Sequence, residues 1–131
     1  NDRISINAGY TYLRVNDLND IDPILYRPKH KLISRIKHTK GKISNIVSMR
    51  YQSKQDYQDF LSDEREYEGS EIRFPIEQLD ALMLFSYIGS YQLLDSKISF
   101  KVSNIFDVDY QLIQDYPMPG RVISLGYEKS F

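Results

Sequence analysis

The stretch that decides the fold is Lys97-Ile98-Ser99-Phe100-Lys101-Val102-Ser103, in which polar and apolar residues alternate without interruption. Successive side chains of a β-strand point to opposite faces, so a period of two predicts a strand. One face of this strand carries branched and aromatic side chains, and the other carries lysines and serines. We therefore expect the strand to separate an apolar environment from an aqueous one.

The same alternation recurs in five other segments of the chain. The predicted strands cover about residues 2–14, 28–40, 43–53, 79–91, 96–106 and 121–131. Lengths near 9–11 residues suit tilted strands that cross a bilayer, whereas soluble strands more often have about 5–6 residues. The pattern predicts an all-β protein, and more specifically an antiparallel transmembrane β-barrel segment.

The connections between these segments alternate in length. Long polar stretches follow the first, third and fifth segments, and short turns at Lys40-Gly41-Lys42 and near Asp95 follow the second and fourth. Successive connections of antiparallel strands lie at opposite ends of a sheet, so the long ones share one end. Bacterial outer-membrane barrels show this asymmetry, with long loops outside and short turns in the periplasm.

Composition excludes several classes of protein. The chain has 131 residues and a net charge of −1, which gives no electrostatic reason to expect nucleic acid. It has no cysteine, so disulfides and cysteine-ligated metals are excluded. No apolar run reaches the roughly 18 residues of a membrane-spanning helix. No catalytic or phosphate-binding motif is present, so we expect neither an enzyme nor a cofactor.

A group of loop and rim residues near the end of the chain carries a family resemblance. The sequence Asn104-Ile-Phe106-Asp107, with Tyr110 nearby, precedes Tyr116-Pro117-Met-Pro119-Gly120-Arg121 and a last strand that ends at Phe131. This order resembles the C-terminus of TonB-dependent outer-membrane receptors, which read Asn-Leu-Phe-Asp and then Tyr-Pro-x-Pro-Gly-Arg. Upstream, Arg27-Pro28-Lys-His30 is similar to the Arg-Pro-x-His element of the same family.

The resemblance implies both a fold and a function. Family members form a 22-stranded barrel around an N-terminal plug, so this sequence would supply about six C-terminal strands and lack the plug. The implied function is TonB-powered import of a scarce nutrient, such as an iron–siderophore complex or cobalamin, across the outer membrane of a Gram-negative bacterium. The implied partners are the remaining strands and plug, TonB through the plug, outer-membrane lipid, and the barrel-assembly machinery, which would recognise Phe131.

The long stretch from Ser53 to Gln78 is the candidate ligand-binding segment. Tyr57, Phe60, Arg65 and Tyr67 lie there among many acidic residues, and family loops of this kind help to capture ligand. The competing interpretation is a solvated external loop without such a role. The basic residues Lys31, Arg35 and Lys37 would attract an anionic ligand or balance acids elsewhere.

Metal binding is the weaker interpretation of two residue groups. His30 and His38 lie about 26 Å apart on one strand face, too far to share an ion. Asp17, Asn19, Asp20 and Asp22 miss the calcium-loop spacing and suit a turn instead. Two other functions stay open: a soluble β-barrel or sandwich that binds a small apolar ligand, and an outer-membrane barrel enzyme.

Overall fold

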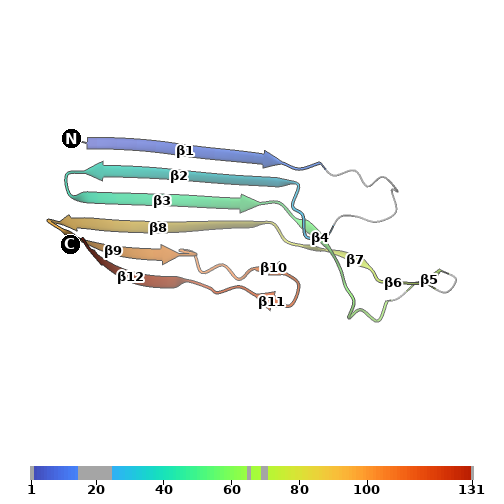
Figure 1. The fold of residues 1–131 in the computed structure, drawn as a ribbon. Coiled ribbons are helices and arrows are strands. Elements are labelled where there is room, and N and C mark those ends of the chain that lie inside the picture. Colours follow the sequence, from blue (N-terminus) through green and yellow to red (C-terminus); the bar gives the residue numbers. More distant parts are fainter. Residues whose placement is uncertain (1, 15–24, 65, 69–70, 131) are drawn as a thin grey trace.

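The computed structural model describes residues 2–14, 25–64, 66–68 and 71–130, and within these ranges it contains strands and connections but no helix. The protein is therefore all-β, with antiparallel sheets. Six long strands form the main sheet (Figure 1): β1 (Asp2–Tyr12), β2 (His30–Lys40), β3 (Ile43–Gln52), β8 (Leu82–Leu93), β9 (Ser96–Ser103) and β12 (Val122–Lys129).

The main sheet is an antiparallel meander in the order β1-β2-β3-β8-β9-β12. Gly41, at a φ of 57°, makes the tight turn between β2 and β3, a backbone conformation that glycine adopts without steric cost. The short turn between β8 and β9 lies at the same end of the sheet (Figure 1). The three long connections leave from the opposite end, which the alternation of connection lengths predicted.

The long connections contain small hairpins that the sequence analysis did not anticipate. In the second connection, β4 (Gln55–Gln58) pairs with β7 (Ile76–Leu79), and β5 (Glu66–Glu68) pairs with β6 (Glu71–Arg73). In the third, β10 (Gln111–Ile113) pairs with β11 (Tyr116–Pro117). Strands of two to four residues are too short to produce a recognisable period of two. The predicted strand over 79–91 is interrupted after Leu79, and β8 begins at Leu82.

One face of the sheet, here called the apolar face, is uniformly hydrophobic across its middle. A single row of cross-strand partners runs over all six strands: Ile6, Ile36, Val47, Tyr87, Val102 and Ile123. The Tyr87 hydroxyl donates a hydrogen bond of 2.6 Å to Oδ1 of Asn45, so its polar tip is satisfied. Register fixes this face, because a slip of one residue would place every side chain on the opposite side.

The opposite face, here called the polar face, carries cations, hydroxyls and a few aliphatic residues. Within the described ranges, Tyr57 and Leu82 are the hydrophobic residues that are buried, so the sheet encloses no core of its own. The sheet is open in the described part of the chain, with β1 and β12 at its edges. No helix among the described residues is both long enough and apolar enough to span a membrane.

Candidate ligand-binding site

The second and third long connections meet beyond the end of the sheet. Nε2 of Gln55, on β4, donates a hydrogen bond of 2.8 Å to the carbonyl of Leu112, on β10. Gln55 is only 5% exposed, so water competes little for this bond. The bond therefore joins two hairpins that lie far apart in the sequence.

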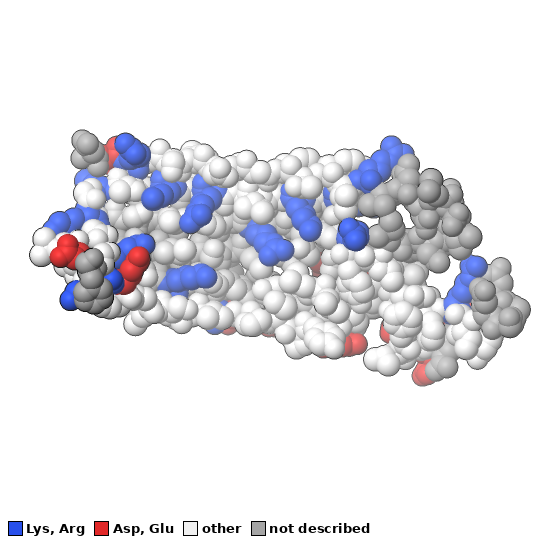
Figure 2. All heavy atoms as spheres, in the orientation of Figure 1, with Lys and Arg blue, Asp and Glu red and all other residues white. Residues whose placement is uncertain are grey.

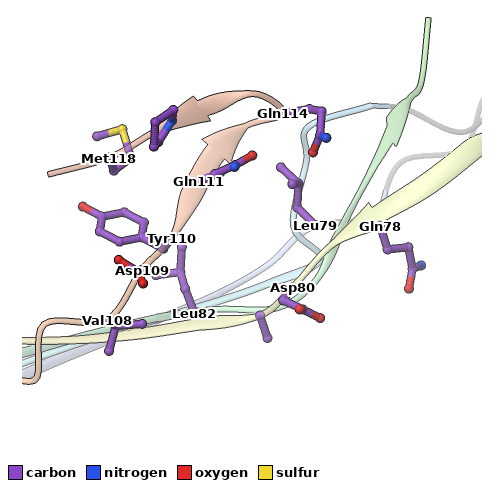
Figure 3. A pocket seen from close by; sticks show the side chains of 12 residues that line it. Gln78, Leu79, Asp80, Leu82, Val108, Asp109, Tyr110, Gln111, Gln114 and Met118 are labelled. Carbon is purple, nitrogen blue, oxygen red and sulfur yellow. The ribbon is translucent and has the colours of Figure 1, made fainter. Parts of the chain in front are cut away.

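A cleft of about 440 Å³ lies between these connections (Figure 3). Its polar lining comes from both of them: Gln78, Asp80, Asp109, Tyr110, Gln111 and Gln114. Amides and a phenol both donate and accept hydrogen bonds, and carboxylates accept them. The cleft is thus suited to a ligand rich in hydroxyl or amino groups. Asp80 also forms an exposed ion pair with Lys54, at 3.3 Å.

A second hollow, of about 470 Å³, adjoins the cleft and lies over the polar face. Tyr110 and Met118 line both spaces. Aliphatic side chains of the sheet, Ile33 and Leu84, face this hollow, and Pro119 lines it from the connection. The proline-containing connection therefore reaches back over the sheet and gives this end of the polar face an apolar compartment.

The sequence around Asn104 forms a tight corner that directs the third connection. Asn104 has a φ of 51°, and its side chain donates a hydrogen bond of 2.8 Å to the Val108 carbonyl and accepts one of 3.0 Å from the Val108 amide. Asparagine tolerates this left-handed conformation better than most residues. Asn104 is 6% exposed, so both hydrogen bonds are sheltered from water.

Asp107 ties this corner to the start of β12. Its carboxylate accepts a hydrogen bond of 2.5 Å from the Arg121 amide, and the Arg121 guanidinium donates one of 3.0 Å to the Ile105 carbonyl. A Cβ on Gly120 would lie 2.7 Å from Oδ1 of Asp107, so the glycine makes room for this contact. Phe106 stands outside this network and packs edge-on against Phe85, with ring centroids 5.4 Å apart.

The two prolines of the third connection lie in and just after its small hairpin. Pro117 belongs to the two-residue strand β11, where it pairs with Gln111. Proline has no amide proton, so it can take part in such pairing only as an acceptor. Tyr116 is 68% exposed and pairs with Ile113, and pairing with the main sheet resumes at Val122.

The Arg27-Pro28-Lys-His30 element links the first three strands. Nδ1 of His30 lies 2.8 Å from the Tyr10 hydroxyl, and its ring contacts that of Tyr12 at 5.2 Å. The backbone of His30 accepts a hydrogen bond of 2.9 Å from the Ser53 amide. Pro28 is buried, whereas Arg27 is exposed. These contacts give His30 a structural role, while His38 pairs with Asp2 at 2.6 Å.

The predicted ligand-binding residues lie in different surroundings. Phe60 is 61% exposed and packs against Phe74, at 5.2 Å between centroids, and Tyr67 is 72% exposed on the β5–β6 hairpin. Tyr57 is buried and stacks on Tyr26. Arg65 falls outside the described residues. A ligand role for this set stays a prediction, and Phe60 and Tyr67 are its accessible members.

The Tyr57 hydroxyl donates a hydrogen bond of 2.5 Å to Oε2 of Glu77. This bond, together with burial and the nearby negative charge of Glu77, raises the pKa of Tyr57 from 10.0 to about 12. The phenol is protonated at neutral pH, as an ordinary tyrosine is, and its hydrogen bond to Glu77 makes it a fixed donor between β4 and β7. The burial of Tyr57 and its hydrogen bond to Glu77 indicate that this side chain has a structural role and does not contact a ligand.

Several residues of the cleft were not singled out from the sequence. Gln78 and Gln114 line the cleft, and Gln55 joins the two connections beside it. All three are unremarkable residues in polar stretches, and only the meeting of the connections brings them together. Two sets of sequence-based predictions, the calcium interpretation of residues 17–22 and the assembly role of Phe131, concern positions outside the described residues.

The comparisons with known proteins leave the family undetermined. No family model matches the chain, and no curated protein is significantly similar to it. The resemblance to TonB-dependent receptors therefore rests on the motif residues alone and stays a prediction.

Proposed function

We propose that the chain forms the C-terminal part of a 22-stranded outer-membrane barrel that belongs to a TonB-dependent transporter. The single observation that carries this proposal is the uncovered apolar face of the main sheet. Its members include Ile6 at 71% exposed, Ile123 at 62% and Leu125 at 81%. An apolar area of this extent on one face marks contact with lipid or protein.

The dimensions of the sheet suit a bilayer. Strands of 11 residues, such as β1 and β2, extend about 36 Å at ~3.3 Å per residue. At a tilt of about 45° this length projects to roughly 25 Å, the height of the apolar band of an outer-membrane barrel. In a barrel, further strands would pair with the edges of β1 and β12, which otherwise would leave backbone groups unsatisfied in lipid.

The long connections would lie outside the cell and provide the entry surface. The cleft between them, with its amide and carboxylate lining, would contact the incoming nutrient, for which an iron–siderophore complex or cobalamin is the class that the motif resemblance suggests. The plug and TonB would supply gating and energy. The corner at Asn104 supports this arrangement, because it directs the third connection over the polar face, which would line the lumen.

Nitroxide labels on two neighbouring residues of β12 test the proposal. The chain has no cysteine, so Leu125→Cys and Ser124→Cys each introduce a unique label within it. Leu125 belongs to the apolar face and Ser124 to the polar face. In the complete protein reconstituted in vesicles, we expect the label at 125 to respond to oxygen and to exclude a water-soluble nickel reagent. The label at 124 should show the opposite preference.

The same pair of labels distinguishes the transporter from the main alternative, a soluble β-barrel. If the apolar face were the interior of a soluble barrel, the label at 125 would be immobilised and shielded from both reagents, and the transporter proposal would fail. Import is tested separately, by uptake of a radiolabelled ferric siderophore or cobalamin into cells that produce the complete protein. Uptake should disappear when TonB is absent.

A further inference from the structure

Charge on the main sheet is segregated to an unusual degree. The chain as a whole has 17 basic and 18 acidic residues. By register, the polar face carries these cations: Arg3, Lys31, Arg35, Lys37, Arg50, Lys97 and Lys101. Glu128 is the described carboxylate on the same face of the paired strands. Figure 2 shows this face, with Lys and Arg distributed over the sheet and few carboxylates between them.

A row of hydroxyl groups crosses this basic face near the short turns. Thr39 pairs with Ser44, Ser44 with Ser90, and Ser90 with Ser99, so the four lie side by side on β2, β3, β8 and β9. All four are half-buried. Neighbouring strands are about 4.8 Å apart, so the row extends roughly 14 Å. Short side chains flanked by long ones leave a depression in the sheet surface.

This depression is a hollow of about 450 Å³, here called the basic hollow. Besides the hydroxyl row, its lining includes Arg35, Lys37, Lys42 and Lys97, and no carboxylate. Glu128 approaches Lys97 from outside the hollow, at 3.9 Å. The four cations are exposed, and like charges gathered on one surface repel one another, so an anion in the hollow would relieve this repulsion.

We propose that the basic hollow is a binding site for a soluble oxyanion that carries two or more negative charges, such as a diphosphate or a polycarboxylate. Lysine and arginine offer only donors, and serine and threonine hydroxyls can each donate one hydrogen bond. The hydroxyls of Ser90 and Ser99 donate to the carbonyls of Ser44 and Gly126 at 3.5 Å, so these two would leave long backbone hydrogen bonds to donate to a bound anion. Oxyanions are acceptors, so donor and acceptor patterns match, and the ion–hydrogen bonds are of the stronger, charge-assisted type. The length of the hydroxyl row favours an anion with two separated charged groups over a single-charge ion.

This site is separate from the cleft at the long-connection end, and the inference goes beyond transport. It requires only the register of the sheet and the polar face, and it holds whether the apolar face meets lipid or protein. Binding can therefore be measured on the complete protein, purified from the soluble or the membrane fraction of the cells. Detergent is added if the protein is found in the membrane fraction. The nitroxide-label and uptake experiments test the transporter proposal, and anion binding tests this inference, so either can fail without the other.

The test is calorimetric titration of the complete protein with inorganic pyrophosphate at constant ionic strength. We expect saturable binding with one site per chain, which weakens as sodium chloride is raised. The double substitution Lys37→Gln and Lys42→Gln removes two cations of the hollow and should weaken binding about tenfold. The matched control, Lys31→Gln with Lys101→Gln, removes two cations of the same polar face outside the hollow and should change binding less than about threefold.

Either of two results would overturn the proposal. Absence of saturable pyrophosphate binding would mean that the hollow is unsuited to a free anion, as expected if carboxylates of another part of the polypeptide already occupy it. Equal weakening by both double substitutions would mean that the basic face attracts anions diffusely. Circular dichroism of each variant, compared with the unsubstituted protein, verifies that the strands are retained.

Discussion

Replacement of Asn104 by alanine should open the corner that directs the third long connection. The substitution removes both hydrogen bonds to Val108, each of which contributes about 1 kcal/mol. It also places a Cβ-bearing residue without a polar side chain at a φ of 51°, which costs about 1 kcal/mol more. Since Asn104 is buried, water does not replace the lost bonds readily, and the total loss should be about 3 kcal/mol.

Glycine at the same position separates the two causes. Asn104→Gly loses the same hydrogen bonds but adopts positive φ without strain, so it should cost about 2 kcal/mol. The exposed Asn7, changed to alanine, is the control and should have almost no effect on the corner. We therefore expect the corner to be most stable in the unsubstituted protein, less stable in the glycine variant and least stable in the alanine variant.

Amide hydrogen exchange of the complete protein measures this loss locally. The Ile105 amide donates to the Phe85 carbonyl at 3.0 Å and the Asp107 amide to the Asn104 carbonyl at 3.0 Å, so both report on the corner. A loss of about 3 kcal/mol raises the opening constant roughly 100-fold. Unchanged protection of both amides in the alanine variant would refute the assigned role of Asn104, and equal effects of alanine and glycine would refute the contribution of φ.

Two further substitutions test contacts in the long connections. Gly120→Ala places a Cβ 2.7 Å from Oδ1 of Asp107 and should destabilise the protein by about 1–2 kcal/mol in denaturant unfolding, whereas Gly9→Ala, with nothing within 4 Å, should be neutral or slightly stabilising. Tyr57→Phe should cost about 1–2 kcal/mol at neutral pH, because Glu77 loses its donor. The pKa of about 12 in the folded protein exceeds the ordinary 10.0, so this stabilisation is present below pH 10 and is lost as pH rises through 12. Unfolding measured across that range should show the two proteins converging, and a constant difference would contradict the assignment.

The strands of the main sheet were accessible to sequence analysis because each is long enough to show its period. Alternation over Lys97–Ser103 corresponds to β9, and the short turn at Gly41 corresponds to a residue that needs positive φ. The hairpins β4–β7 and β10–β11 were not predicted. Their strands have only two to four residues, and the partners β4 and β7 are separated by a long interval of sequence.

The candidate sites differ in how much of them the sequence could predict. Lys31, Arg35 and Lys37 indicated a basic face directly, because residues two apart on a strand share a side. The hydroxyl row of the basic hollow was not visible, since Thr39, Ser44, Ser90 and Ser99 become neighbours only through the register of four strands. The polar cleft likewise depends on the hydrogen bond between Gln55 and Leu112.

The sequence by itself determined the all-β class, the antiparallel order and the two contrasting faces, because alternation and turn residues are local properties of the chain. Only the tertiary structure decided which residues meet across the sheet and how the long connections fold back on it. Register and loop packing are set by contacts between distant segments, and a hollow is formed by the spaces between side chains, which no single stretch of sequence contains.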